Sequence, residues 1–156
     1  MAGRPPACVA AFCTAPTTKP RKPGVATDEE MSSFMTENAW ADIIVVDARN
    51  PDFAAEPGDE RWGEDSAAPI AAAGSAARPN ALNLVYDRPT KSMDLGPLEA
   101  LLADGGDDKA VPIVTHCGGG GRGQKAKDFL EAEGYTNVLN GGGPQVPELW
   151  EEFGGL

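Results

Sequence analysis

Two short runs of aliphatic and β-branched residues constrain the fold of this chain more than any other feature. They are Asp42–Asp47 (DIIVVD) and Val111–His116 (VPIVTH), and neither shows the apolar–polar alternation of a half-exposed strand. Continuous runs of this kind are typical of strands buried on both faces, which occur in parallel sheets covered by helices. We therefore expect an α/β protein, with Pro112 tolerated near the start of its strand.

Strand-like and helix-like segments alternate along the rest of the chain. Thr27 and Glu30 have the spacing of a capping box, which predicts the start of a helix. Alternation of strand and helix favours right-handed crossovers, which give a parallel sheet with helices on both faces. Two further strands are predicted at Ala81–Tyr86 and Tyr135–Leu139, and three further helices at Leu95–Ala103, Gln124–Glu133 and Pro144–Phe153.

The length of 156 residues fits one domain. We expect residues 1–23 to be a flexible tail, with a targeting remnant as the alternative, and residues 24–156 to be the domain. Residues from about 54 to 78 show almost no periodic apolar pattern, so we expect a long mobile insertion there rather than an ordered lid. Cys8 and Cys13, in the tail, are interpreted as ordinary thiols rather than as a disulfide or a metal site. A cytoplasmic location is expected, or an organelle if the tail is a transit segment.

Composition argues against several classes of function. The chain has 24 acidic and 13 basic residues and a net charge of −11. A body this acidic repels nucleic acids and anionic membranes, and no apolar run approaches the roughly 20 residues of a membrane span. With one histidine, His116, and three cysteines, the chain lacks the residues for a histidine-rich or four-cysteine metal site. We therefore expect no metal and no cofactor.

The chemistry is expected after the second buried run, where the sequence reads His-Cys-Gly-Gly-Gly-Gly-Arg-Gly before a helix pattern begins. Glycine permits positive φ angles and a close approach of the backbone to a bound group. Loop N–H groups and the N-terminus of the next helix then form a cradle for a small anion, which favours the thiolate of Cys117 as a nucleophile. The alternative is a glycine-rich turn beside a structural cysteine. The residues predicted to bind substrate are Gly118, Gly119, Gly120, Gly121, Arg122 and Gly123.

His116 precedes this cysteine directly and raises the question of a cysteine–histidine dyad. Adjacent residues of a strand point to opposite faces of the sheet. We therefore do not expect His116 to be the base for Cys117. We expect His116 to be packed in the interior, or to lie with the tip of its ring at the surface.

Five short motifs and a tryptophan follow one another along the chain: Val46–Arg49 (VDAR), Asn80–Leu84 (NALNL), His116–Gly123, Gly134–Val138 (GYTNV), Leu139–Gly143 (LNGGG) and Trp150. In order and spacing, over roughly residues 24–153, they resemble a single rhodanese domain. The resemblance implies a small five-stranded parallel sheet with helices on both sides, and a persulfide carried by Cys117. Asp47 and Arg49 lie near the carboxyl edge of the sheet, where ligands bind in open α/β folds, and are expected to brace the loop by ion pairing.

The chain also differs from the family pattern at two places. Residues Ala76–Pro79 (AARP) stand where the family usually has Gly-His-Ile. The loop between Cys117 and Arg122 has no polar side chain, whereas the family often has hydroxyl or cationic groups there. These differences concern the substrate and the catalytic strength rather than the fold.

Loop length separates two kinds of enzyme with this fold. Sulfurtransferases run from Cys to Arg in six residues, as Cys117 to Arg122 does, whereas the related phosphatases and arsenate reductases have a loop one residue longer. We therefore predict a thiosulfate sulfurtransferase-like enzyme. It would move a sulfane sulfur from thiosulfate, or a similar small anionic donor, to a thiol or cyanide acceptor through a Cys117 persulfide. The alternatives are a phosphatase or arsenate reductase, and a weakly active binding module that docks on a basic protein partner.

Overall fold

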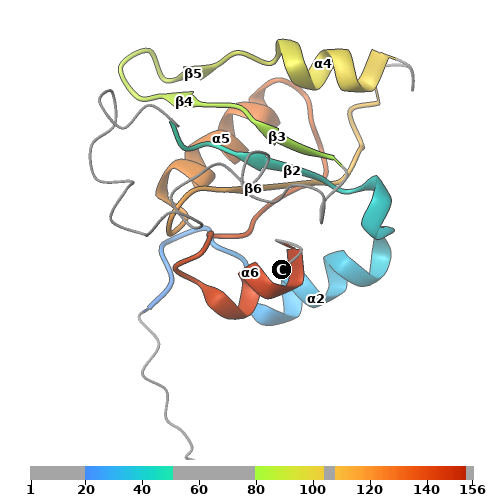
Figure 1. The fold of residues 1–156 in the computed structure, drawn as a ribbon, viewed down its shortest axis with the longest axis vertical. Coiled ribbons are helices and arrows are strands. Elements are labelled where there is room, and N and C mark those ends of the chain that lie inside the picture. Colours follow the sequence, from blue (N-terminus) through green and yellow to red (C-terminus); the bar gives the residue numbers. More distant parts are fainter. Residues whose placement is uncertain (1–19, 51–79, 104–107, 154–156) are drawn as a thin grey trace, which may run out of the picture.

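The computed structural model describes residues 20–50, 80–103 and 108–153. Within them, four parallel strands form one sheet in the order β3–β2–β6–β7 (Figure 1). The two buried runs supply the central strands β2 and β6, whose residues are all buried. The prediction of an α/β fold with a parallel sheet is therefore confirmed. The strands are β2 (Ile44–Asp47), β3 (Ala81–Asn83), β6 (Ile113–His116) and β7 (Val138–Asn140).

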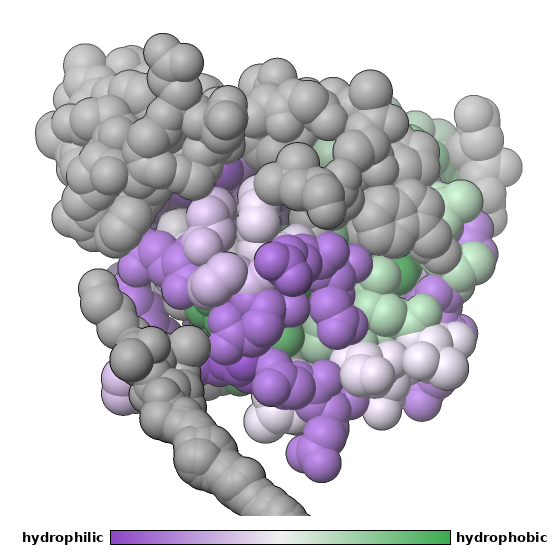
Figure 2. Space-filling view, turned by 60° about the horizontal axis from the view of Figure 1, so that its bottom comes forward, coloured by the Kyte–Doolittle hydropathy of each residue, from purple (hydrophilic) through white to green (hydrophobic). Residues whose placement is uncertain are grey.

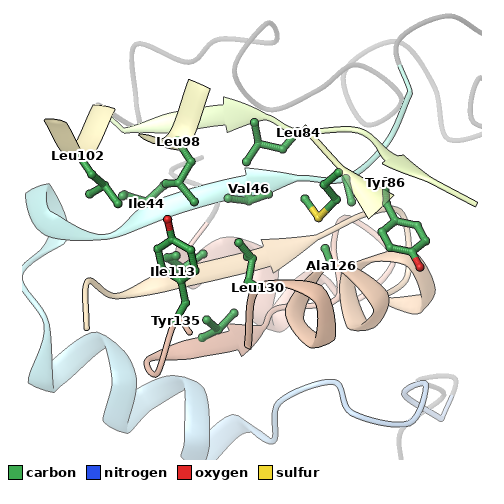
Figure 3. Packing of buried hydrophobic residues seen from close by; sticks show 13 residues of the cluster. Ile44, Val46, Leu84, Tyr86, Leu98, Leu102, Ile113, Ala126, Leu130 and Tyr135 are labelled. Carbon is green, nitrogen blue, oxygen red and sulfur yellow. The ribbon is translucent and has the colours of Figure 1, made fainter. Parts of the chain in front are cut away.

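Helices cover both faces of this sheet, as Figure 1 shows. Ile44 and Val46 of β2 belong to one apolar cluster and Val45 to the other, because successive strand residues point to opposite faces. The first cluster includes side chains of α4 and α5, and Figure 3 shows Leu98 of α4 pointing toward the sheet. The second cluster includes side chains of α2 and α6. The helices are α2 (Asp28–Glu37), α4 (Gly96–Leu102), α5 (Gly121–Ala132) and α6 (Pro147–Phe153).

The expected count of five parallel strands is wrong for the part of the chain that the structure describes. Beyond β7, the place of a fifth strand is taken by a single parallel bridge between Val25 and Asn140. A turn at Lys22–Val25 precedes this bridge, and Thr27 caps α2 directly after it. Too few residues lie between the turn and the helix cap to form a longer ladder.

The chain leaves the sheet earlier than predicted after β3. The segment Ala81–Tyr86 is not one strand, because it divides into β3 and β4 (Tyr86–Asp87), which pairs with β5 (Ser92–Met93) in a separate antiparallel hairpin. The Asn83 amide donates to the backbone oxygens of both Asp47 and Arg49. Beyond the last ladder pair, the Leu84 and Tyr86 N–H groups still donate to the Asp47 and Ala48 oxygens, and the ladder ends where Tyr86–Asp87 turns away to pair with Ser92–Met93.

Other boundaries also shift by a few residues. Strand β2 begins after a 3₁₀ turn, η1 (Trp40–Asp42), whereas the prediction started at Asp42. Strand β7 begins at Val138 rather than Tyr135, whose N–H donates to the oxygen of Leu130 at the end of α5. Helix α5 begins at Gly121, before the predicted Gln124, and α6 begins at Pro147, after the predicted Pro144. The capping box of α2 is confirmed in both of its hydrogen bonds.

Helices α2 and α6 carry only acidic charged residues. Figure 2, in which the lower side of Figure 1 comes forward, shows hydrophilic side chains gathered over the described part of this face. None of the described helices combines the length and the apolar character needed to cross a lipid bilayer. The predicted insertion and the tail cysteines lie outside the described residues.

Candidate active site

Cys117 follows the last residue of β6 and is 3% exposed, so the end of a buried strand places its thiol inside the protein. The chain then turns through three glycines into α5. Gly120 is the N-cap of this helix and has a φ of +115°, a left-handed conformation that L side chains rarely adopt. This turn directs the Gly120 N–H at the Cys117 Sγ, at 3.1 Å. A backbone donor of the loop therefore faces the thiol, as an anion cradle requires.

Arg122 is the second residue of α5, so it belongs to the helix rather than to the loop. Its side chain is 7% exposed, and the helix N-terminus adds a partial positive charge beside the loop. A guanidinium and oriented backbone N–H groups can together hold an oxyanion near the thiol. The sequence predicted that Arg122 and the loop N–H groups lie together at the carboxyl end of β6. In the structure, the loop and the start of α5 both lie at this end of the strand.

Gly123, one of the predicted substrate-binding glycines, is packed closely against the sheet. A Cβ on this residue would lie 2.8 Å from the Asn140 Oδ1 and 3.1 Å from the Cα of His116. Its backbone oxygen accepts a hydrogen bond from the Thr115 hydroxyl at 2.8 Å. Close packing of α5 on the sheet thus explains the glycine at this position.

The glycine-rich turn after β7 packs directly on the active-site loop. The Cys117 N–H donates to the Gly142 oxygen at 3.1 Å, and the Gln145 N–H donates to the Gly118 oxygen at 2.9 Å. A Cβ on Gly143 would lie 1.9 Å from the backbone oxygen of Cys117. The second loop therefore holds the first at its cysteine end. The sequence motif contained these glycines but gave no sign of this contact.

Asn140 connects the two loops and was not among the predicted site residues. Its amide nitrogen donates to the Gly120 oxygen at 3.0 Å, and its Oδ1 accepts the Gly142 N–H at 3.0 Å. The side chain is fully buried at the carboxyl end of β7. A polar residue at the end of a buried strand was the sequence signal that could have identified it.

Asp47 and Arg49 form a fully buried ion pair with each other. The Arg49 Nη2 lies 2.8 Å from the Asp47 Oδ2, and its Nε donates to both carboxylate oxygens. The Asp47 Oδ2 lies 4.0 Å from the Nε2 of His116, and Ala48 donates its N–H to the His116 oxygen. The pair therefore contacts the residue that precedes Cys117, and a bracing role would act through the end of β6.

His116 is fully buried, in agreement with the packed alternative. Its ring packs against Trp150 and Phe153 of α6, with ring-centre distances of 5.0 and 5.6 Å. Its Nδ1 lies 3.2 Å from the Cys117 oxygen, which can only accept, so Nδ1 carries the hydrogen in this contact. Burial lowers the pKa of His116; the nearby Asp47 opposes this shift and Arg49 adds to it. The ring is therefore a neutral packing group near pH 7.

Taken together, the fold and the site define an α/β protein with a buried cysteine between the end of a central strand and a glycine-rich loop. This loop leads into the N-terminus of a helix. A family model of the rhodanese-like domain matches residues 27–143. The chain therefore belongs to the rhodanese family, as its sequence motifs predicted. Searches of curated proteins and of solved structures each find no match. The described residues contain no group of three or more histidine, cysteine, aspartate or glutamate side chains that could hold a metal ion.

Proposed function

We propose that this protein is a sulfurtransferase that carries a sulfane sulfur on Cys117. The observation that supports this most directly is the hydrogen bond of 3.1 Å from the Gly120 N–H to the Cys117 Sγ, at the N-terminus of α5. A donor aimed at sulfur stabilises a thiolate, and the same donor would stabilise the negative charge of a persulfide. Rhodanese-family membership supports the same chemistry.

The proposed reaction is a double displacement. The Cys117 thiolate attacks the outer sulfur of thiosulfate, the sulfur–sulfur bond of the donor breaks, and sulfite leaves with its electron pair. Cyanide or a thiolate then attacks the outer sulfur of the persulfide. The bond between the two sulfurs breaks, which gives thiocyanate or a new persulfide and returns the Cys117 thiolate. No external oxidant or reductant is needed.

The first test measures thiocyanate formation from thiosulfate and cyanide. Cys117→Ser should abolish turnover, because serine is a far weaker nucleophile and cannot hold the transferred sulfur. The matched control is the double variant Cys8→Ser and Cys13→Ser, which replaces the other two cysteines of the chain and should keep the activity. Turnover that survives Cys117→Ser would contradict the mechanism.

Two further readouts separate the alternatives. Intact-mass spectrometry after thiosulfate treatment should show one added sulfur atom on the wild type and none on Cys117→Ser. A chain that gains no sulfur but binds a basic protein partner would be a binding module instead. Hydrolysis of an aryl phosphate faster than the consumption of thiosulfate would make the protein a phosphatase.

A further inference from the structure

The active-site loop of this chain lacks a polar side chain of its own between Cys117 and Arg122. The structure brings another segment to this place. Residues Lys22–Val25 form a turn in which the Val25 N–H donates to the Lys22 oxygen at 3.1 Å. Proline follows lysine in this turn, and Gly24 has a φ of +88°, which is the pattern of a type II turn.

This turn is held against the loop by Val25. A Cβ on Gly120 would lie 2.4 Å from the Val25 Cγ2, so the isopropyl group occupies the space that a larger loop residue would need. Val25 also forms the parallel bridge with Asn140, and Ala26 donates its N–H to the Asn140 oxygen at 2.9 Å. The same asparagine holds Gly120. The turn and the active-site loop therefore share one anchor.

The result is a cation beside the first residue of α5. The Lys22 Nζ lies 3.4 Å from the position of a Cβ on Gly121, and the side chain is exposed. The structure shows no ion pair or hydrogen bond of this ammonium group within the residues it describes. The neighbouring Arg21, in contrast, binds both Asp28 and Glu148. Arg21 thus fastens the start of the turn to α2 and α6, and Lys22 is available to an incoming anion.

We propose that Lys22 is a second substrate-binding cation of this active site, beside Arg122, and recognises the sulfonate oxygens of the sulfur donor. The inference rests on the proposed function and specifies its substrate class, a donor with a terminal oxyanion group. An ammonium at the N-terminus of α5 adds its full charge to the helix dipole and the loop N–H groups.

Steady-state kinetics with thiosulfate and cyanide test this assignment. Lys22→Gln should raise the KM for thiosulfate about fivefold and change kcat by less than about twofold, because an exposed cation contributes mainly to uniform binding. Lys22→Arg should stay near the wild type. Lys109→Gln removes the same charge near the opposite end of β6 and serves as the matched control. Equal KM values for Lys22→Gln and Lys109→Gln would overturn the proposal.

A second measurement does not depend on sulfur transfer. Iodoacetamide, which is uncharged, should alkylate Cys117, and inorganic sulfate should protect the thiol by occupying the anion site. The alkylated fraction is read by mass spectrometry of the tryptic peptide that contains Cys117 as its sole cysteine, which is residues 110–122, or residues 92–122 in Lys109→Gln, where the cleavage site at Lys109 is lost. Lys22→Gln should raise the half-protecting sulfate concentration about fivefold, and Lys109→Gln should leave it unchanged.

The two measurements distinguish failure of the inference from failure of the proposed function. If sulfate protects the wild type and Lys22→Gln equally, or protects neither, Lys22 is not an anion-binding residue. If protection depends on Lys22 but thiosulfate adds no sulfur to Cys117, the anion site stands and the sulfurtransferase function is wrong.

Discussion

Buried polar side chains surround the residue that precedes the cysteine. Asp47, Arg49, Thr115, His116 and Asn140 are all fully buried at the carboxyl ends of β2, β6 and β7. A buried ion pair is weak evidence of stabilisation, because removing two charges from water costs about as much as their attraction returns. Their positions suggest a different role. The side chains of Thr115, His116 and Asn140 hydrogen-bond backbone groups of the two glycine-rich loops and of the first turn of α5, next to the thiol.

The pH dependence of stability should report on His116. Burial lowers the pKa of this histidine in the folded protein, whereas the unfolded chain takes up a proton near its ordinary pKa of 6.5. The free energy of unfolding should therefore fall as the pH drops below about 6.5, by up to about 1.4 kcal/mol per pH unit. Above this pH the histidine contributes no slope, because neither state is protonated there.

Urea denaturation of the wild type and of His116→Phe between pH 7.5 and 5.5 measures this contribution. Phenylalanine keeps an aromatic ring against Trp150 and Phe153 but cannot take up a proton. The wild type should lose stability with falling pH more steeply than the variant. Carboxylates titrate in both proteins, so parallel curves would show that His116 carries no linked proton.

At the scale of elements, the contact between the β7–α6 turn and the active-site loop determines the shape of the site. Gly143 has a φ of +135°, and a Cβ there would lie 1.9 Å from the Cys117 oxygen. The Cβ is bonded directly to the Cα of residue 143, and the oxygen belongs to the backbone of Cys117. Rotating a side chain therefore cannot relieve this steric clash. The turn must therefore move away from the loop if this glycine is replaced.

Gly143→Ala should destabilise the protein by at least about 3 kcal/mol, through backbone strain and overpacking together. Gly134→Ala is the matched control, because Gly134 has a φ of +102° but only a Lys109 side-chain carbon, at 4.0 Å, near its Cβ position. It should lose only about 1–2 kcal/mol from strain. Urea denaturation measures both variants. Equal losses would mean that the two loops are not packed as described.

The sequence predicted the types of these elements better than their ends. Continuous β-branched runs identified β2 and β6, since burial on both faces leaves a clear pattern. The end of β3 depended on a change of partner, because Tyr86–Asp87 pairs with Ser92–Met93 instead of extending the ladder with β2, and no local pattern marks this change. The start of α5 depended on the left-handed Gly120, and four consecutive glycines do not show which one adopts this conformation.

At the scale of the whole molecule, the charge opposes the proposed donor. The chain has a net charge of −11, and α2 and α6 place acidic residues together on the hydrophilic face of Figure 2. Such a field repels a dianion during its approach. Attraction is left to the groups of the active-site loop and of the start of α5, such as the Gly120 N–H, 3.1 Å from the thiol sulfur, and Arg122. Salt screens distant charges more strongly than contacts at short range.

The kcat/KM for thiosulfate should therefore rise by about two- to fivefold as the ionic strength increases from about 10 to 150 mM, where the Debye length falls from about 30 to 8 Å. The alkylation of Cys117 by uncharged iodoacetamide is the control and should change little over the same range. A kcat/KM that falls with salt would show that cations near the site, rather than the acidic body, dominate the approach of the donor.

The sequence by itself determined the parallel α/β fold, the family and the position of the cysteine at the end of a buried strand. These properties depend on local patterns: β-branched runs, glycines, and a cysteine and an arginine six residues apart at the two ends of one loop. The tertiary structure alone decided that Asn140 holds both loops and that Lys22 lies beside Gly121. The contact of Asn140 with Gly120 spans 20 positions, and that of Lys22 with Gly121 spans about 100. No local pattern encodes which distant side chain fills the space left by a glycine.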